Sequence, residues 1–286
     1  MAESMSQPAP RSPFPYGIVL SDVDGTLLRP THALSVRTIS AIRALHEAGI
    51  PLALATGRMP SGLSEITREL DVPCWRICYS GAYVTDDAGR PIASETIPLD
   101  VARAVLQVLR TQWPQLAPCY FVGPHWYVED PSAPGIVREA AIVRATPERA
   151  AFDTLLVDGV APNKLFCNCR GDASRSEELR RTLCARFPQL TVIRSSNGSL
   201  VEIVRSDVSK ATGAAALLAH LGLSMRRALA FGDDENDVPL LQAVGHGVAM
   251  GNAAPRVRRC AAEVAPPNAE DGLAQVLERL LGMPHP

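Results

Sequence analysis

An apolar run ends in two aspartates in the segment LSDVDGTLL, residues 20–28. Asp22 and Asp24 are one residue apart, so in an extended chain both side chains point to the same side. Gly25 follows and lets the chain turn away. A buried strand that ends in paired negative charge is unfavourable unless a positive group meets it. The segment therefore predicts a buried strand over 17–21 that delivers two carboxylates to a site holding positive charge.

The residues after this segment alternate between strand and helix patterns. A helix is expected from Ser35, which suits an N-cap, to Gly49, which suits the position after a helix end. Short apolar runs at 50–55 and 75–80 are predicted to be buried strands, and the stretch 62–70 between them is predicted to be a helix. Strand, helix, strand, helix, strand is the pattern of a parallel α/β sheet.

A different pattern occupies the middle of the chain, from about Tyr83 to Val204. Short strands and helices are mixed there, and turn-rich pieces such as DDAGRP and EDPSAPG separate them. This pattern predicts a separate α+β unit inserted into the first fold, with strands over 92–97, 119–122, 126–129, 163–169 and 190–195, and helices over 99–112, 134–145 and 174–187. The parallel pattern then resumes with a helix over 209–223 and strands over 228–234 and 247–252.

Length and charge narrow the class of protein. A chain of 286 residues exceeds what one hydrophobic core comfortably fills, so two domains, or one domain with a large insertion, are expected. The net charge is −2, and the only basic cluster is the short run 256–260, which argues against a nucleic-acid partner. No apolar run approaches the length that crosses a membrane, so no membrane partner is expected either. The sequence carries no signal about oligomeric state.

The N-terminus and the cysteines indicate where such a chain works. Residues 1–16 are polar and contain four prolines, so we predict a disordered tail that lacks the apolar centre of a signal peptide. The seven cysteines are odd in number and have no zinc-ligand spacing, so they are predicted to be buried apolar residues in a reducing compartment. These features predict a cytoplasmic protein.

Polar residues gather where the predicted parallel strands end. Because ligand sites in open parallel sheets form beyond the carboxyl ends of the strands, we expect these groups to converge. The four groups are Asp22 with Asp24, TGR at 56–58, Ser80 with Gly81, and GDDENDVP at 232–239.

The acidic residues in these groups need a positive partner. Asp22, Asp24, Asp233 and Asp237 would repel one another in one crevice, and a hard cation with oxygen ligands resolves the conflict. Mg²⁺ fits best, because it takes one or two carboxylates and keeps positions for water and phosphate oxygens. Lys210 begins a predicted helix and can bring a second positive charge. Together these groups predict a site for phosphoryl groups.

The motifs resemble a known family. In order, DVDGTLL, TGR, Lys210 within VEIVRSDVSKATGAA, and GDDENDVPLL resemble the four motifs of the haloacid dehalogenase (HAD) superfamily of phosphotransferases. SGAYV, the large insert, VAMGNA and EDGLA resemble its Cof-type branch, subfamily IIB with a C2B cap. The resemblance is specific over about 17–84 and 200–280 and weak in the insert. It implies a Rossmann-like parallel-sheet core over 17–84 and 204–286, with an inserted α+β cap over 85–203.

The resemblance also implies roles for individual residues. Asp22 would be the nucleophile that forms an aspartyl-phosphate, and Asp24 the general acid that then serves as base. Lys210 would neutralise charge on the phosphate and the nucleophile. The other implied sets are the substrate-binding residues Thr56, Gly57, Arg58, Ser80 and Gly81, and the Mg²⁺ site of Asp22, Asp24 (through its backbone carbonyl), Asp233, Asn236 and Asp237.

Some positions depart from the family pattern or stay open. Ser80 stands where this branch commonly has Asn, Ala211 where Gly is common, and Asp234 where Gly is often found. Arg58 is expected either to contact substrate or cap, or to form a structural ion pair. Lys164, in PNKLF of the insert, is expected to face solvent or to be structural rather than to reach a substrate.

The function implied is a Mg²⁺-dependent phosphatase, a phosphoric monoester hydrolase, acting on small phosphorylated metabolites such as sugar phosphates, nucleotides or cofactor phosphates. Two alternatives remain open at this point. A phosphomutase of the same branch would share these core residues, and a phosphate-sensing protein would use the acidic pocket without turnover. The placement of Asp24 to hydrolyse an aspartyl-phosphate weighs against the sensor. The sequence does not identify the substrate.

Overall fold

The structure is a computed structural model, and it describes residues 14–169, 171–195 and 200–283. Most of the predicted tail, residues 1–13, lies outside the described residues. Phe14 is buried, and its ring lies edge-on to that of Tyr16 with 5.9 Å between the ring centres. The packed chain therefore includes Phe14, ahead of the predicted start at Gly17.

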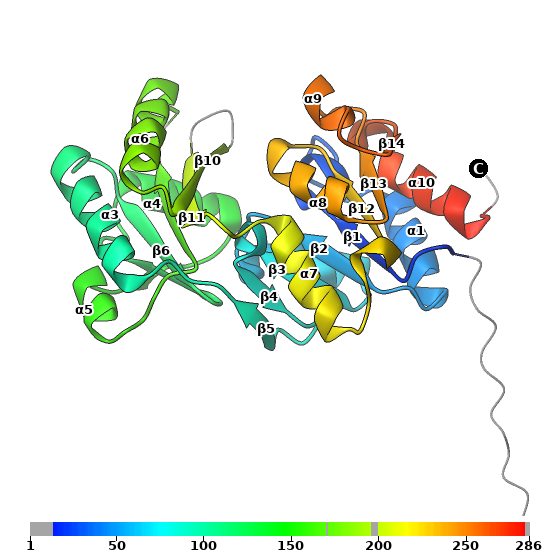
Figure 1. Cartoon of the computed structure of the whole chain (residues 1–286), viewed down its shortest axis with the longest axis horizontal. Coiled ribbons are helices and arrows are strands. Elements are labelled where there is room, and N and C mark those ends of the chain that lie inside the picture. Colours follow the sequence, from blue (N-terminus) through cyan, green and yellow to red (C-terminus); the bar gives the residue numbers. More distant parts are fainter. Residues whose placement is uncertain (1–13, 170, 196–199, 284–286) are drawn as a thin grey trace, which may run out of the picture.

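The main sheet has eight strands in the order β14-β13-β12-β1-β2-β3-β4-β5 (Figure 1). From β14 to β3 all neighbours are parallel, whereas β4 and β5 pair antiparallel at one edge. The parallel part confirms the predicted α/β core. The strands are β1 (Ile18–Ser21), β2 (Leu52–Ala55), β3 (Cys74–Cys78), β4 (Tyr83–Thr85), β5 (Pro91–Ser94), β12 (Ala228–Gly232), β13 (His246–Ala249) and β14 (Glu263–Val264).

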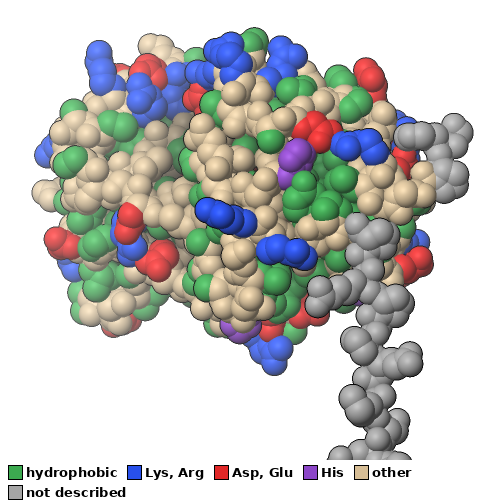
Figure 2. Space-filling view, turned by 45° about the vertical axis from the view of Figure 1, so that its right-hand side comes forward, with side chains coloured by type: hydrophobic (Ala, Val, Ile, Leu, Met, Phe, Trp, Pro, Cys, Tyr) green, Lys and Arg blue, Asp and Glu red, His purple; other side chains and the backbone are tan. Residues whose placement is uncertain are grey.

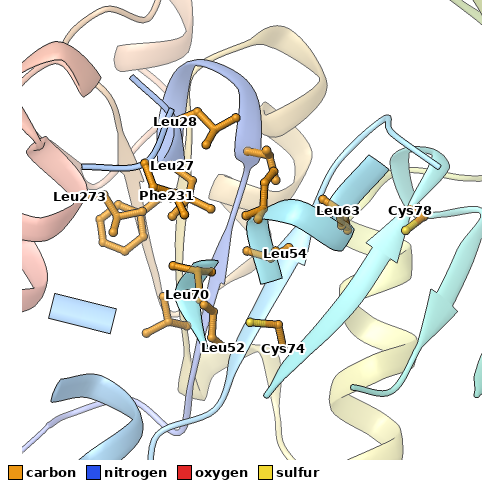
Figure 3. Close-up of a cluster of buried hydrophobic side chains, with 14 of the residues drawn as sticks. Leu27, Leu28, Leu52, Leu54, Leu63, Leu70, Cys74, Cys78, Phe231 and Leu273 are labelled. Atoms are coloured by element: carbon orange, nitrogen blue, oxygen red, sulfur yellow. The ribbon is translucent and has the colours of Figure 1, made fainter. Parts of the chain in front are cut away.

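Helices cover both faces of this sheet, and its central strands β1, β2 and β12 are buried along their whole length. Val19 of β1 packs in a cluster with one set of helices, and its neighbours Ile18 and Leu20 pack in another, because successive side chains point to opposite faces. Figure 3 shows part of the first cluster. Each large apolar side chain buried there contributes about 1.5–3 kcal/mol. The first face is covered by α1 (Val36–Glu47), α2 (Ser64–Leu70) and α10 (Gly272–Leu281), and the second by α7 (Lys210–His220), α8 (Val238–Ala243) and α9 (Pro255–Arg258).

The first helix begins and ends where the sequence predicts. The Ser35 hydroxyl oxygen accepts the backbone N–H of Thr38 at 2.9 Å, which caps the start of α1. Gly49 follows its end with φ 76°, a conformation that glycine adopts without a steric penalty. The following chain can therefore turn directly into β2.

A second sheet of six strands forms in the middle of the chain, in the order β10-β11-β9-β6-β7-β8. Its strands are antiparallel except for the β7–β8 pair. The strands are β6 (Pro118–Val122), β7 (His125–Val128), β8 (Glu148–Arg149), β9 (Lys164–Asn168), β10 (Leu190–Ser195) and β11 (Leu200–Arg205), and the helices are α3 (Leu99–Gln112), α4 (Pro134–Val143), α5 (Phe152–Val157) and α6 (Ala173–Arg186). This mixture matches the α+β pattern expected there.

The two sheets do not divide the chain where the sequence suggested. β4 and β5 continue the main sheet as an antiparallel hairpin, so the boundary placed between residues 84 and 85 falls inside that sheet. The boundary placed between 203 and 204 falls within β11, which belongs to the second sheet. A hairpin at a sheet edge has the same local pattern in either unit, so strand patterns alone cannot assign it.

The distribution of charged side chains on the surface and the lengths of the helices agree with what the sequence predicts. Figure 2 shows a face on which basic and acidic side chains are scattered among hydrophobic and uncharged ones, as the near-neutral net charge of −2 suggests. Within the described ranges, none of the helices combines the length and the apolar character needed to cross a membrane.

Candidate active site

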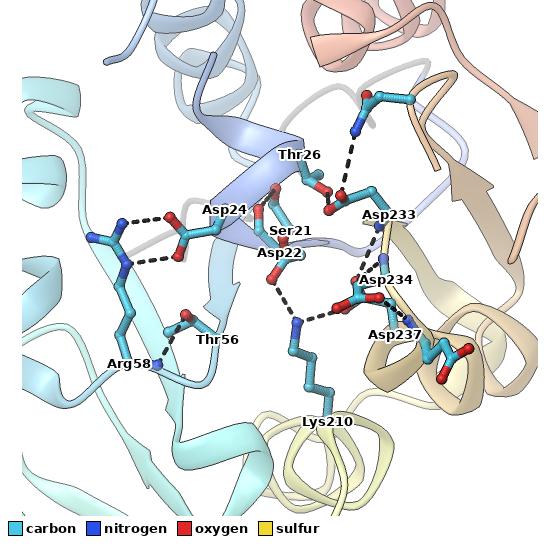
Figure 4. Close-up of polar contacts among 12 residues, drawn as sticks. Ser21, Asp22, Asp24, Thr26, Thr56, Arg58, Lys210, Asp233, Asp234 and Asp237 are labelled. Carbon is cyan, nitrogen blue, oxygen red and sulfur yellow. Dashed lines mark hydrogen bonds and ion pairs between the residues drawn. The ribbon is translucent and has the colours of Figure 1, made fainter. Parts of the chain in front are cut away.

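The predicted polar groups converge at the carboxyl ends of β1, β2, β3 and β12. Figure 4 shows the groups that follow β1, β2 and β12. Backbone hydrogen bonds tie these strand ends together. The N–H of Asp22 donates to the Phe231 carbonyl at 3.0 Å, and the N–H of Ser80 donates to the Thr56 carbonyl at 2.9 Å. The site is therefore built on neighbouring, hydrogen-bonded strands in the interior of the main sheet.

Lys210 joins two of the predicted carboxylates. Its Nζ lies 2.6 Å from Asp22 Oδ1 and 2.6 Å from Asp237 Oδ1, and its side chain is 1% exposed. Burial lowers the pKa of Lys210, but the charges and hydrogen bonds of the two aspartates outweigh burial and raise the pKa above its ordinary value. Ser209 caps α7 through a reciprocal pair of bonds with Thr212, which fixes the start of the helix and hence Lys210.

Asp22 is the most heavily perturbed carboxyl of the group. Burial raises the pKa of Asp22 well above its ordinary value, the charge of Lys210 opposes that rise, and Asp237 and Asp233 add to it. Its Oδ1 is held by Lys210, whereas its Oδ2 is buried and has no hydrogen-bond partner among the described residues. A buried carboxylate oxygen of this kind is suited to bind a cation, because buried polar atoms are normally paired.

The acidic cluster of Asp22, Asp233 and Asp237 is suited to a divalent metal ion. One carboxylate oxygen from each lies within 4.8 Å of the others. Burial raises the pKa of Asp233 to about 6, against the opposing hydrogen bond from Thr26. Asp237 accepts the backbone N–H groups of Asp233 and Asp234, both at 3.1 Å, and so orders the loop. The unpaired Asp22 oxygen and the all-oxygen donor set fit a hard cation.

Asn236 was predicted to belong to the same metal site. Its side-chain oxygen is buried and has no hydrogen-bond partner among the described residues. Like Asp22 Oδ2, this oxygen of the loop that carries Asp233 and Asp237 is therefore available to bind a cation.

Asp24 does not point the same way as Asp22, contrary to the expectation from their spacing. Strand β1 ends at Ser21, so the alternation of an extended chain does not reach Asp24. Its carboxylate accepts two hydrogen bonds from Arg58, Nε to Oδ2 at 2.8 Å and Nη2 to Oδ1 at 2.6 Å (Figure 4). Two roles were expected for Arg58, a contact with substrate or cap and a structural ion pair. In this structure Arg58 forms an ion pair with Asp24. Burial lowers the pKa of Arg58, but the hydrogen bond and charge of Asp24 raise it overall.

The turn Thr56–Arg58 faces this cluster from the end of β2. The Thr56 hydroxyl oxygen accepts the Arg58 N–H at 3.1 Å, which shapes the turn. Ser80 sits beside it in a left-handed conformation, φ 55°, as does Tyr79, φ 51°. Asn tolerates that conformation better than Ser, which gives a physical reason for the Asn that is common in this branch. Such strain is typical of functional sites.

Gly81, which stays a predicted substrate-binding residue, makes a packing contact in the structure. Its φ is 111°, and a Cβ atom there would lie 2.0 Å from the Ser209 carbonyl oxygen and 3.3 Å from the Lys210 N atom. The missing side chain therefore lets the start of α7 approach β3. Gly81 contributes to the site by allowing Lys210 to reach Asp22.

Replacing Gly81 by alanine is expected to destabilise the protein by about 3 kcal/mol or more, through backbone strain and the clash with Ser209. Gly89→Ala is the matched control. Gly89 also has a positive φ, 84°, but a Cβ atom there would meet only the Arg76 Nη1 atom at 3.7 Å. That change is expected to cost about 1 kcal/mol. Chemical denaturation of both variants gives the comparison, and equal losses would contradict the packing role.

Sequence reasoning missed two side chains that hold Asp233. Thr26 donates its hydroxyl to Asp233 Oδ1 at 2.9 Å, and the Asn252 amide donates to Asp233 Oδ2 at 3.3 Å and to the Gly25 carbonyl at 2.9 Å. Asn252 comes soon after β13, so it is a further polar residue beyond a parallel strand end. The rule used for the other four groups applies to it as well.

Comparisons with known proteins agree with this geometry. A family model described as haloacid dehalogenase-like hydrolase matches residues 19–277. A Haemophilus influenzae protein is 30% identical over 264 residues, which cover 92% of this chain and 97% of that protein. An Escherichia coli protein named HMP-PP phosphatase is 30% identical over 238 residues, which cover 83% of this chain and 85% of that protein.

Solved structures are similar over nearly the whole chain. A haloacid dehalogenase-like hydrolase from Bacteroides thetaiotaomicron has a TM-score of 0.81 at 26% identity, covering 93% of this chain and 99% of that chain. A sugar phosphatase of HAD subclass IIB has a TM-score of 0.75 at 25% identity, covering 92% of this chain and 98% of that chain.

Proposed function

Because this chain belongs to the haloacid dehalogenase-like hydrolases and is a phosphatase, we propose that it hydrolyses small phosphorylated metabolites through an aspartyl-phosphate on Asp22. One observation carries this proposal. Asp22 holds Lys210 with one carboxylate oxygen, its other oxygen is buried without a hydrogen-bond partner among the described residues, and the residue lies in one acidic cluster with Asp233 and Asp237. A carboxylate held in this way is oriented to attack, and the lysine neutralises charge on the phosphoryl group.

The proposed reaction has two steps. In the first, an Asp22 oxygen forms a bond to phosphorus while the bond to the leaving oxygen breaks, and Asp24 gives its proton to that oxygen. In the second, Asp24 takes a proton from water, which attacks phosphorus and releases Asp22 and inorganic phosphate. Thr56 and the Gly57 N–H are proposed to hold the phosphoryl group. For this chemistry Asp24 has to leave Arg58, with which it is paired in the structure.

We propose Mg²⁺ as the metal, held by Asp22 and Asp233, by the Asp24 carbonyl, and with support from Asn236 and Asp237. Bound there, Mg²⁺ would neutralise charge on the phosphoryl oxygens and on the nucleophile. The donor chemistry supports this choice, because the carboxylate cluster offers only oxygen ligands.

The second sheet and its helices are proposed to form the cap that selects the substrate. The proposal rests on the resemblance to C2B caps and on the fact that this unit is inserted between β5 and α7 of the main fold. The named relatives act on HMP-PP and on sugar phosphates. Both names describe substrates that are small phosphorylated metabolites. A cytoplasmic location is proposed for the chain, because such metabolites occur there.

A screen of the purified chain tests the function. With Mg²⁺ present, release of inorganic phosphate is measured over a panel of phosphorylated sugars, nucleotides and cofactors. Rapid release from at least one compound is expected, and no release over the whole panel would contradict the proposal. The panel includes a sugar 1-phosphate, because a phosphomutase would convert it to the 6-phosphate isomer without releasing phosphate.

Asp233→Asn is expected to weaken Mg²⁺ binding by about 100-fold or more, since changes even outside the ligand set often cost 10–100-fold. Asp234→Asn is the matched control, because Asp234 lies in the same loop but its carboxylate accepts the Glu235 N–H, which asparagine can also cap. Calorimetric titration with Mg²⁺ measures both variants. Similar losses in the two would remove Asp233 from the proposed metal site.

Asp24→Asn is expected to lower turnover of alkyl phosphates by about 10²–10⁴-fold, because the alkoxide leaving group needs a proton. An aryl phosphate such as p-nitrophenyl phosphate needs none, so this variant should release one nitrophenolate per site in a burst and then stall at the second step. Stopped-flow absorbance detects the burst. His32→Gln, which removes an exposed neighbour 3.6 Å from Asp24, serves as the control. Intact turnover of alkyl phosphates by Asp24→Asn would overturn its role.

A further inference from the structure

A cationic contact joins the second sheet to the turn Thr56–Arg58. Lys164 lies on β9, and its Nζ donates to the Gly57 carbonyl at 2.8 Å and to Glu202 Oε2 at 3.1 Å. Its side chain is 7% exposed, so the sequence-based expectation that it faces solvent is wrong and the structural alternative holds.

Protein groups surround the ammonium group of Lys164. Besides its two hydrogen bonds, it lies 5.0–5.5 Å from the ring centres of Tyr79, Phe121 and Phe166. A cation enclosed by aromatic faces and two oxygen acceptors is stabilised without a ligand. Direct contact with a substrate is therefore not the simplest use of this residue.

The preceding residue fixes the start of β9 in the same region. Asn163 is 1% exposed; its side chain donates to the Ala82 carbonyl at 3.2 Å and to the Glu95 carbonyl at 2.8 Å, and it accepts the Gly123 N–H at 2.7 Å. Lys164 therefore extends from a backbone that is already anchored to the main sheet. The position of Lys164 relative to Gly57 therefore depends on how the second sheet packs against the main sheet.

Glu202, on β11, places a negative charge beside the same turn. A Cβ atom at Gly57 would lie 3.2 Å from Glu202 Oε2 and 3.5 Å from the Ser80 hydroxyl oxygen. An uncompensated carboxylate there would oppose the binding of a phosphoryl group, and Lys164 neutralises it through their ion pair. Lys164 thus acts on the turn both through its charge and through the bond to the Gly57 carbonyl.

Composition supports a specific need for lysine at this position. Only two of the 28 Lys and Arg residues are lysines, Lys164 and Lys210, and both are buried. Everywhere else the chain uses arginine, including in its exposed ion pairs. A compact ammonium group fits into a small enclosure that is too narrow for a planar guanidinium. The two buried positions therefore require the smaller group, whereas exposed positions do not.

We propose that Lys164 is a positioning residue that couples the seating of the second sheet to the phosphoryl-binding turn. It holds the Gly57 carbonyl and so orients the Gly57–Arg58 peptide, whose N–H donates to the hydroxyl oxygen of Thr56, a residue proposed to hold the phosphoryl group. This inference rests on the proposed function for the role of the turn. Lys164 then affects every phosphate ester alike, because it acts on the group that all substrates share rather than on the leaving group.

Calorimetric binding of inorganic phosphate to the full chain with Mg²⁺ tests this role without turnover. Lys164→Met is expected to weaken phosphate binding about tenfold or more, given the cost of a small misplacement in such a site. The double variant Lys164→Met/Glu202→Gln restores the net charge of the pair but not the bond to Gly57. It also removes the Glu202 charge that Lys164 balances, which matters if the single variant folds poorly. The double variant is expected to recover only the part of the loss that comes from the Glu202 charge and to keep the part that comes from the bond to Gly57.

Arg144→Met is the matched control, because it also removes an ion pair between the two units, the exposed pair with Glu65. It should bind phosphate as the wild type does. Wild-type affinity in Lys164→Met, or full recovery in the double variant, would overturn the positioning role, as would a wild-type protein that binds no phosphate. A loss of kcat/KM that differs strongly between leaving groups would also overturn it. A wild type that binds phosphate but hydrolyses nothing would refute only the proposed function.

Discussion

Replacing Asp22 by asparagine is expected to abolish phosphate release, lowering kcat/KM by about four orders of magnitude or more. The asparagine amide is close in shape to the carboxylate but is a poor nucleophile. Among the described residues, the only other carboxylate in contact with Lys210 is that of Asp237, which already accepts two backbone N–H groups of the loop. The variant should stay folded, because Lys210 keeps Asp237 as its partner.

Steady-state phosphate release, with a thermal melt to verify folding, measures the effect of Asp22→Asn. Asp234→Asn provides the comparison within the same acidic region and should retain activity. Turnover by Asp22→Asn within tenfold of the wild type would show that a different group attacks phosphorus.

Replacing Lys210 by methionine is expected to lower the free energy of unfolding by about 3–5 kcal/mol at pH 7.5 and to remove activity, because Asp22 and Asp237 would then be buried side by side without their cation. The raised pKa of Lys210 means that its stabilising contribution is complete below its unfolded pKa of 10.5, so the wild type has all of it at pH 5 and at pH 7.5.

The loss in Lys210→Met should therefore depend on pH through the carboxylates. The folded state raises the pKa of Asp22, so protonation at lower pH favours folding and relieves the unpaired charge. The difference between wild type and variant, from denaturant titrations, should shrink from pH 7.5 to pH 5. Mg²⁺ should reduce it at pH 7.5. A loss that is the same at both pH values and unaffected by Mg²⁺ would mean that packing, not charge, accounts for it.

Much of the core of the site was predictable from strand ends alone. Parallel strands all finish at one edge of the sheet, so Asp22 after β1 and Asp233 after β12 meet although they are far apart in the sequence. The helix cap at Ser35 is likewise local chemistry that a short segment contains. Strand ends and helix caps are set by the residues of one short segment, so they can be read from the sequence.

Other features depend on side-chain packing between distant segments, which periodicity does not express. The pairing of Asp24 with Arg58 is a choice among side-chain orientations, and the packing role of Gly81 appears only when α7 is placed against it. Lys164 is buried because three aromatic rings from separate segments enclose it. Its neighbours in sequence, by contrast, resemble those of an ordinary strand.

The central claim is that Asp22 takes up the phosphoryl group, and mass spectrometry tests it most directly. Asp24→Asn, which should stall after the first step, is mixed with an aryl phosphate and Mg²⁺, quenched in acid and digested. The peptide that contains residues 20–28 should carry the mass of one phosphoryl group on Asp22, and the same peptide from Asp22→Asn should carry none. A burst of leaving group without this label, or a label on another residue, would contradict the account.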